Sequence, residues 1–300
     1  MMRYGSTARG TKRWRCTRCG ITRTSRNKAN HYHRQFHWFK QWITEGFTVK
    51  QLAKESGHSR WMIRSVIAYW LKHPPTMPAL VQTYVCLFDG TYLDRSSGLL
   101  VMMGVDSTTV AGAYGLTERP RDLQQFFRSL AEQRLCPRSV TVDGNLHVIR
   151  ALRGQWPTAI IQRCVVHVQR QGLMWCRRFP KRVDARRLRT LFLTVTAITT
   201  PAEKNIWLTQ LASWEARYGA RIAASRETGW VFSDLKRARC MVLKASPNLF
   251  HYLDHPEIPR TTNGLEGYFG RLKDRYRDHR GLARTNRSAY FQWYMRLCPR

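Results

Sequence analysis

The stretch YVCLFDG, residues 84–90, is an apolar run that ends abruptly in an aspartate and a glycine. The same ending recurs in SVTVDGN, residues 139–145. Short apolar runs followed by turn residues are typical of buried strands. A carboxylate at the end of a buried strand is costly unless a positive group meets it. We therefore expect Asp89 and Asp143 to end two strands at a site where a cation binds.

Each of these aspartates precedes a glycine, Gly90 or Gly144. A glycine has no side chain, so we expect both positions to leave space for a large ligand to approach the backbone. The alternative is that Asp-Gly is ordinary turn chemistry and binds nothing.

The segments around these two runs complete a mixed α/β pattern. Three more strands are predicted at LLVMMGV (99–105), TTVAGAYGL (108–116) and AIIQRC (159–164). One amphipathic helix is predicted at PRDLQQFFRSLAEQRL (120–135). A short helix is expected after Asp143. The first three strands have connections short enough for an antiparallel meander, so the sequence predicts a mixed sheet. Helical periodicity from 165 to about 255, with a break at 199–201, predicts a largely helical segment.

The composition narrows the class of partner. The chain has 300 residues, with 51 lysines and arginines against 19 aspartates and glutamates, a net charge of +32. Such an excess favours a polyanion, because each neutralised phosphate releases counterions. An anionic membrane surface is the other candidate. The sequence has no apolar run near the roughly 20 residues of a membrane span and no signal segment, so we expect a soluble, intracellular protein.

The N-terminal residues 1–30 contain a single C-x-x-C, formed by Cys16 and Cys19. This is half of a zinc ribbon, because a structural Zn²⁺ takes four ligands. Three histidines could complete the site, namely His31, His33 and His37. The alternative is a packed helix with exposed histidines, because the apolar residues of that stretch recur at helical spacing.

Residues 47–71, FTVKQLAKESGHSRWMIRSVIAYWL, predict two short helices around a tight turn. Gly57 suits the turn, and Ser59 can cap the second helix. The apolar positions form the small core of a helix-turn-helix, although an ordinary helical hairpin would share them. In a helix-turn-helix, the residues that begin the DNA-reading helix would be Arg60, Trp61 and Arg64.

A third carboxylate lies in TTNGLEGYFGRLKDRYRDHRG, residues 261–281. A surface that only bound DNA would gain nothing from Glu266, because a carboxylate repels phosphate. Hard divalent cations prefer oxygen ligands, and two Mg²⁺ ions about 4 Å apart can stabilise the attacking and leaving oxygens of a phosphoryl transfer. Asp89, Asp143 and Glu266 would suit two Mg²⁺ ions, for which Mn²⁺ can substitute. Glu266 could instead be an acid that favours a helix N-terminus.

Taken in order, these motifs resemble those of the Mutator-like DDE transposases of bacterial insertion sequences. The matching stretches are LFDGTYL around Asp89, VTVDGN around Asp143, QRCVVHVQR (162–170), TTNGLEG (261–267) and HRGL (279–282). The C-x-x-H formed by Cys164 and His167 is a mark of that branch, and the resemblance assigns both residues to the catalytic region. The sequence departs from this family at Met1 and Tyr4, which stand where such proteins usually carry a further cysteine pair.

The resemblance implies an RNase H-like catalytic core with an all-helical insertion, preceded by a helix-turn-helix and a partial zinc ribbon. The partial ribbon would cover 1–30, and the helix-turn-helix with its linker (HPPTMP, 73–78) would cover 31–78. The first part of the core would cover 79–170, the insertion 171–258 and the last core helix 259–300. In the insertion, Trp207, Trp214 and Trp230 are expected in the core, and a base-stacking role for one of them is the alternative.

The activity implied by the resemblance is transposition. The helix-turn-helix would bind the terminal inverted repeats of double-stranded DNA, and Arg271, Lys273 and Arg275 would hold phosphates of the scissile strand. Mg²⁺-dependent hydrolysis would free a 3′-hydroxyl, which then attacks target DNA. Since paired ends must be cut in step, we expect a dimer or larger assembly on DNA, in the nucleoid of a bacterial cytoplasm. The alternatives are a metal-dependent DNA nuclease that joins no strands and an inactive, transposase-derived DNA-binding regulator.

Overall fold

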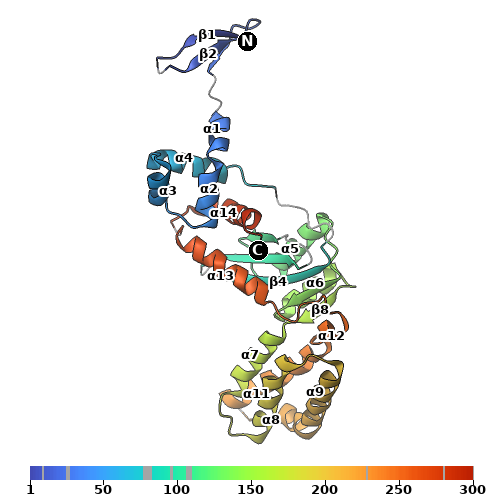
Figure 1. Cartoon of the computed structure of the whole chain (residues 1–300). Helices are drawn as coiled ribbons and strands as arrows, with labels where there is room; N and C mark the ends of the chain where they lie inside the picture. The colour runs from blue at the N-terminus through green and yellow to red at the C-terminus, as the bar shows by residue number, and fades with distance from the viewer. Residues whose placement is uncertain are drawn as a thin grey trace. The chain divides into compact units, whose positions relative to one another are not determined.

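The computed structural model describes residues 1–8, 10–24, 28–76, 83–94, 97–105, 110–227, 229–279 and 281–299 (Figure 1). The end of the predicted linker, 77–78, and the first residues of the predicted third strand, 108–109, lie outside these ranges. The chain forms two compact units, Met1–Thr76 with Leu272–Cys298, and Met77–Arg271 with the last two residues. None of the described helices combines the length and hydrophobicity that a bilayer crossing requires.

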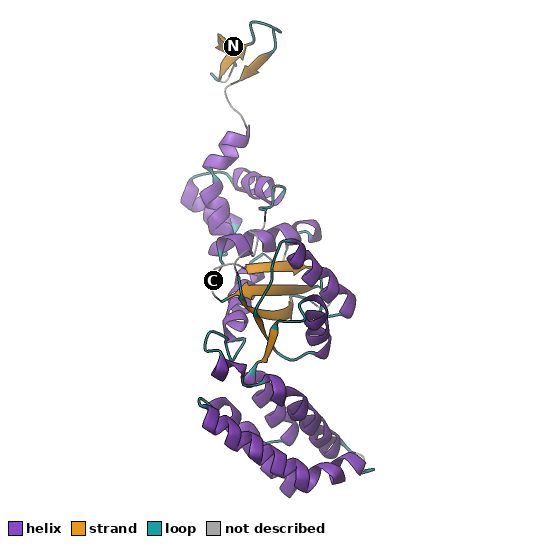
Figure 2. Ribbon diagram, turned by 90° about the vertical axis from the view of Figure 1, so that its right-hand side faces the viewer, coloured by secondary structure: helices purple, strands orange, loops and turns teal. Residues whose placement is uncertain are grey.

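The second unit contains a mixed five-stranded sheet, which confirms the α/β class (Figure 2). Its strands are β4 (Val85–Tyr92), β5 (Gly98–Gly104), β6 (Val110–Tyr114), β7 (Ser139–Val142) and β8 (Ile160–Arg163). The strand order is β6-β5-β4-β7-β8. The strands β4, β5 and β6 form the predicted antiparallel meander, whereas β7 runs parallel to both β4 and β8. The parallel register pairs Leu87 of β4 with Thr141 of β7, so the residues that follow, including Asp89 and Asp143, lie beside each other.

Two helices pack on one face of this sheet. They are α5 (Pro120–Glu132), which begins at a proline, and α6 (Leu146–Gln155), which follows the second aspartate as predicted. The side chain of Asn145 accepts a hydrogen bond of 2.9 Å from the amide of His147 and so caps α6. Both helices share one apolar core with the sheet, in which Phe88 and Phe127 are almost fully buried.

The segment that leads into α13 (Asn263–Arg277) is fixed to the ends of β7 and β8. The hydroxyl of Thr141 donates a hydrogen bond of 2.7 Å to the carbonyl of Pro259. The amide of Val165 donates a hydrogen bond of 3.0 Å to the carbonyl of Arg260. A Cβ on Gly264 would lie 3.5 Å from Leu87. Side chains alternate along a strand, so Leu87 faces away from the α5 and α6 side that Phe88 faces. The start of α13 therefore lies against the opposite face of the sheet.

The predicted helical segment is confirmed. Its elements are α7 (Val165–Cys176), α8 (Val183–Thr194), η1 (Val195–Ala197), α9 (Pro201–Trp214), the π-helical turn η2 (Glu215–Gly219), α10 (Ala220–Ala224), α11 (Trp230–Ala245), η3 (Ser246–Asn248) and α12 (His251–Asp254). The expected break falls just before α9, where Thr200 and Glu203 form a capping box.

The core of this helical segment contains two of the three expected tryptophans. Trp207 and Trp214 are buried. The expectation for Trp230 was wrong, because its side chain is 84% exposed. Trp230 is the first residue of α11, and the buried face of that helix begins at Phe232.

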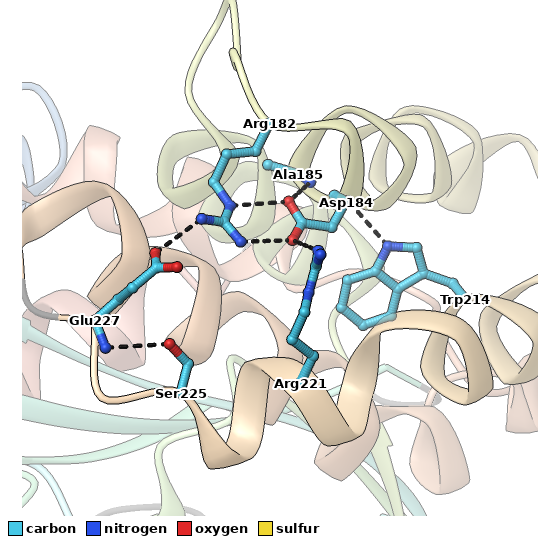
Figure 3. A network of polar contacts seen from close by, with 7 residues as sticks. All are labelled: Arg182, Asp184, Ala185, Trp214, Arg221, Ser225 and Glu227. Atoms are coloured by element: carbon cyan, nitrogen blue, oxygen red, sulfur yellow. Dashed lines mark hydrogen bonds and ion pairs between the residues drawn. The ribbon is translucent and has the colours of Figure 1, made fainter.

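A buried carboxylate with two arginine partners also stabilises the helical segment (Figure 3). Asp184 is 1% exposed and accepts hydrogen bonds of 3.0 Å from both Arg182 and Arg221. Burial works to raise the pKa of Asp184, but the hydrogen bonds from Arg182 and from the amide of Ala185 outweigh it and lower the pKa. The indole of Trp214 donates to the carbonyl of Asp184 at 2.9 Å. This aspartate is therefore fully accounted for as a structural residue.

The first unit begins with a three-stranded antiparallel sheet, formed by β1 (Met2–Ser6), β2 (Lys12–Arg15) and β3 (Thr22–Thr24). It continues with α1 (Lys28–Arg34) and α2 (Phe36–Thr44). The stretch expected to form one packed helix is thus divided at Gln35. Its histidines are exposed, as the helical alternative required, and its buried side chains include Phe39, Trp42 and Ile43.

The two helices predicted around Gly57 are α3 (Val49–Ser56) and α4 (Arg60–Leu71). Gly57 ends α3 with a φ of 66°, a left-handed conformation that favours glycine. Ser59 caps α4 by accepting a hydrogen bond of 3.2 Å from the amide of Met62. Helix α14 (Arg284–Leu297) packs on α4, and the indole of Trp293 donates to the carbonyl of Trp70 at 2.9 Å.

Candidate active site

Asp89 lies inside β4, paired with Val101 of β5, so the expectation that it ends its strand was wrong, whereas Asp143 directly follows the last residue of β7 as predicted. The parallel register of β4 and β7 places the two aspartates level with each other. Asp89 Oδ1 accepts the amide of Gly90 at 2.9 Å, and Asp143 Oδ1 accepts the amide of Asn145 at the same distance. Burial, followed by the nearby charge of Asp143, raises the pKa of Asp89 from 3.8 to about 7. Within the described residues neither aspartate forms an ion pair, in contrast to Asp184. The basic groups beside them are Arg163, which donates to the backbone carbonyl of Asp143, and His167, whose charge lowers the pKa of Asp89.

Glu266 lies in the first turn of α13 and comes from the segment fixed to β7 and β8. Its Oε2 accepts a hydrogen bond of 3.3 Å from Arg170, and its Oε1 lies 3.7 Å from Nε2 of His167. Oε1 is buried and accepts no hydrogen bond from any described residue. The charges of Asp143 and Glu266 both raise the pKa of His167, and the charge of His167 lowers the pKa of Asp89. The three predicted carboxylates are therefore gathered around one histidine.

Cys164 and His167 lie at the junction of β8 and α7, beside Thr262. The Thr262 hydroxyl is 3.5 Å from the Cys164 sulfur and 3.4 Å from Nδ1 of His167. Burial works to raise the pKa of Cys164, but hydrogen bonds with His167 and Thr262 outweigh it and lower the pKa. The hydrogen bond to Cys164 raises the pKa of His167, and the nearby acids add to this. The pair thus favours a protonated imidazole facing Glu266.

A fourth carboxylate, Glu118, was missed by the sequence analysis. It lies between β6 and α5, and its Oε2 accepts a hydrogen bond of 2.6 Å from the amide group of Asn145. Burial, and then the charge of Asp143, raises the pKa of Glu118, and the charge of Glu118 raises that of Asp89. Its position depends on how β6 returns along the sheet, so no local pattern in the sequence indicates it.

The spaces beside the two glycines are filled by side chains, so the expectation that they admit a large ligand was wrong. A Cβ on Gly90 would lie 2.8 Å from Oε1 of Glu118. A Cβ on Gly144 would lie 1.8 Å from Nη2 of Arg163, and Gly144 has a φ of 109°. Arg163 is 6% exposed, and its Nη2 donates to the carbonyl of Asp143 at 3.3 Å. The absence of a side chain at Gly90 therefore makes room for Glu118, and its absence at Gly144 makes room for Arg163.

The donor set fits a hard divalent cation. All the groups that meet at the strand ends are carboxylates, which are the ligands that Mg²⁺ and Mn²⁺ prefer. The buried Oε1 of Glu266 has no hydrogen-bond donor among the described residues, and both causes that raise the pKa of Asp89, burial first and then the charge of Asp143, are ones that a bound cation offsets. No three described histidine, cysteine or acidic side chains are arranged around one common metal position.

The predicted zinc ligands lie in the loop between β2 and β3. Cys16 is half-buried and Cys19 is exposed. Hydrogen bonds from the backbone amides of Cys19 and Arg18 lower the pKa of Cys16 to about 7, which favours the thiolate that binds metals. In the part of the chain that the structure describes, no third ligand lies beside this pair.

The predicted DNA-binding residues differ in their exposure. Arg60, Trp61 and Arg64 are all exposed on the first turns of α4, and Trp61 is 74% exposed. On α13, Arg271 is exposed and Lys273 is half-buried. Arg275 is already engaged, because its Nη1 donates to the carbonyl of Glu45 at 2.9 Å and its Nη2 lies 3.8 Å from the Glu45 carboxylate.

A basic groove lies between α5 and α6, close to the carboxylates in sequence. Its volume is about 520 Å³, and its lining includes Gln124, Arg128, His147 and Arg150. Neither arginine forms an ion pair with a described residue. The groove begins at Pro120 and His147, two residues after Glu118 and Asn145 respectively.

No protein-family model and no curated protein sequence matches this chain.

Proposed function

We propose that this protein is a DDE transposase of the Mutator-like type, which binds terminal inverted repeats and performs Mg²⁺-dependent DNA cleavage and strand transfer. The observation that carries the proposal is the gathering of Asp89, Asp143 and Glu266 around His167. These residues come from two neighbouring strand segments and a helix far along the chain, and the sequence motifs selected the same three carboxylates.

The sheet supports an RNase H-like core. Three antiparallel strands followed by two parallel ones, in the order β6-β5-β4-β7-β8, form a mixed sheet that is compatible with such a core. The helical segment between β8 and α13 matches the implied insertion, because it interrupts the sequence between Asp143 and Glu266. Figure 2 shows the sheet and these helices together.

The residues at the strand ends would hold two Mg²⁺ ions through Asp89, Asp143 and Glu266. When bound, such ions activate the attacking water or 3′-hydroxyl and stabilise the leaving oxygen. The sheet fixes the two aspartates, whereas Glu266 is oriented from its own side by His167 and Arg170. His167, whose pKa is raised, would keep a positive charge beside this carboxylate.

The basic surface supports DNA as the substrate. Helices α3 and α4 meet at a glycine turn, which suits a helix-turn-helix, and the first residues of α4 are exposed arginines and a tryptophan. The net charge of +32 would hold the phosphates of the terminal repeats and of target DNA. Cutting both ends in step requires at least two copies on DNA, and the protein would act at the nucleoid of a bacterial cell.

The test is cleavage of a labelled duplex that spans the boundary of the element, with Mg²⁺ or Mn²⁺ and a supercoiled target plasmid. We expect the wild type to nick the boundary and join the freed end to the target. Glu266→Gln should lose both activities but keep DNA binding. The control is Glu257→Gln, an exposed acid paired with Arg138, which should remain active. Nicking without joining would indicate a nuclease, and binding without nicking would indicate a DNA-binding regulator.

A further inference from the structure

Glu118 is placed between the two aspartates by two independent contacts. Its Oε2 accepts the amide group of Asn145 at 2.6 Å, and the backbone amide of Asn145 donates to Asp143. Its Oε1 lies 2.8 Å from the position of a Cβ on Gly90, the residue after Asp89. Glu118 therefore lies beside Gly90, the residue after Asp89, and Asn145, the second residue after Asp143.

The turn before α5 and the first turn of that helix are held without this carboxylate. The turn before α5 is held by Asp122, which accepts the amide of Thr117 at 2.9 Å and its hydroxyl at 2.8 Å. The N-cap residue of α5 is Arg119, and its side chain makes no capping hydrogen bond. Glu118 stabilises neither the turn nor the helix through these contacts.

The surroundings of Glu118 are also unusual for an acid in this chain. Acids are outnumbered by 51 to 19, yet Glu118 forms no ion pair with any described lysine or arginine. It lies instead beside two other acids whose charges repel its own. The buried Asp184, which has two arginine partners, shows what a purely structural acid looks like here. A carboxylate held among carboxylates is explained by a cation that they share.

We propose that Glu118 is a fourth carboxylate ligand of the divalent cation that Asp89 and Asp143 hold. This inference rests on the proposed function. Asn145 engages Oε2, so Oε1 is the oxygen assigned to the cation. Asn145 is the positioning residue, because it also holds Asp143 and caps α6, and it thereby sets the two acids relative to each other. Gly90 is needed because any side chain there would displace Oε1.

The experiment measures Mn²⁺ binding to the full-length protein, with free Mn²⁺ followed by electron paramagnetic resonance. Glu118→Gln removes the charge but keeps an oxygen that can accept from Asn145. We expect it to weaken Mn²⁺ binding about 10-fold, as loss of one ligand or its close support typically does. Asp143→Asn should weaken binding at least as much. Glu132→Gln, an exposed acid on α5, is the matched control and should bind Mn²⁺ like the wild type.

The outcomes separate this inference from the proposed function. If Glu118→Gln binds Mn²⁺ as tightly as the wild type while Asp143→Asn does not, the metal site stands and the role of Glu118 is refuted. If the wild type binds no Mn²⁺, the proposed function fails together with the inference. Thermal unfolding in EDTA checks that each variant folds. Should Glu118→Gln not fold, Glu118→Asp retains the charge but withdraws the oxygen by one methylene, and unchanged Mn²⁺ binding by that variant would equally refute the proposal.

Discussion

Nε2 of His167 lies 3.7 Å from Oε1 of Glu266, the one oxygen of that carboxylate that is buried and receives no hydrogen bond from a described residue. On its other side the same ring is 3.4 Å from the hydroxyl of Thr262. His167 therefore connects the end of β8 to the start of α13. This gives the C-x-x-H motif a physical role, since the histidine orients the third carboxylate and Cys164 orients the histidine.

Replacing His167 with glutamine is expected to reduce DNA cleavage about 10- to 100-fold, the usual effect of removing a group that orients a metal ligand. Glutamine can still donate a hydrogen bond but carries no charge. We expect a parallel loss of Mn²⁺ affinity, with unchanged DNA binding and an unchanged unfolding temperature in EDTA.

The control for this variant is His255→Gln, because His255 lies beside Glu257 and Arg138 and away from the site. It should cleave like the wild type. A His167→Gln protein with full cleavage and full Mn²⁺ affinity would show that the contact with Glu266 has no part in the site.

The pKa of Asp89 predicts how stability depends on pH when no divalent cation is present. This pKa is raised from 3.8 to about 7, so between these values the folded protein keeps a proton that the unfolded chain has released. The free energy of unfolding must then fall as the pH rises through this window. Asp89→Asn removes the fall. We expect the variant to match the wild type near the lower end of the window and to exceed it by up to about 4 kcal/mol above the upper end, because each pKa unit of the shift corresponds to about 1.4 kcal/mol.

Urea unfolding in EDTA at several pH values measures this difference. Asp274→Asn, an exposed acid paired with Arg277, should change the profile little. Adding Mg²⁺ at the higher pH should stabilise the wild type but not Asp89→Asn, because only the folded wild type then binds the ion. Equal pH profiles for the wild type and Asp89→Asn would contradict the burial and repulsion that we assign to this carboxylate.

Two glycines of the same region offer a matched test of the packing behind Asp143. Alanine at Gly144 would be strained at a φ of 109° and would overlap the buried guanidinium of Arg163. We expect Gly144→Ala to lower the free energy of unfolding by about 2–4 kcal/mol, from strain and overpacking together. Gly154, on α6, has no described atom within 4 Å of its Cβ position. Gly154→Ala should therefore be neutral or stabilising by up to about 1 kcal/mol. Chemical denaturation compares the two, and similar losses would show that Arg163 does not pack as described.

The sequence predicted those parts of the site that local patterns record. The apolar runs that stop at Asp89 and Asp143 can be recognised from neighbouring residues alone. Both strands were therefore located to within a few positions. Pairing between strands is not recorded in this way. Glu118 reaches the site only because β6 lies at the far edge of the meander, and its sequence context is that of a surface turn.

The same limit explains the errors. The glycines after both aspartates suggested open space, but side chains from other strands and loops occupy it. Trp230 has the apolar character of a core residue, yet it precedes the first buried turn of its helix. Nothing in the sequence indicated that Arg275, one of the cations after Glu266, is paired with Glu45, a residue more than 200 positions away in the sequence. Contacts between distant segments decide each case.

The groove between α5 and α6 predicts where phosphates bind beside the active site. Arg128 and Arg150 line it without a described acidic partner, so their charges are available to the phosphates of the proposed DNA substrate. Replacing both with glutamine should reduce the slope of log affinity against log salt by about 2, since each phosphate contact contributes roughly 0.9. The control is the double change Arg138→Gln and Arg237→Gln, which alters net charge equally but removes arginines already paired with Glu257 and Asp234. Fluorescence anisotropy over a range of salt measures both slopes. If the two double variants have the same slope, the groove makes no phosphate contacts and DNA must cross the carboxylates from another direction.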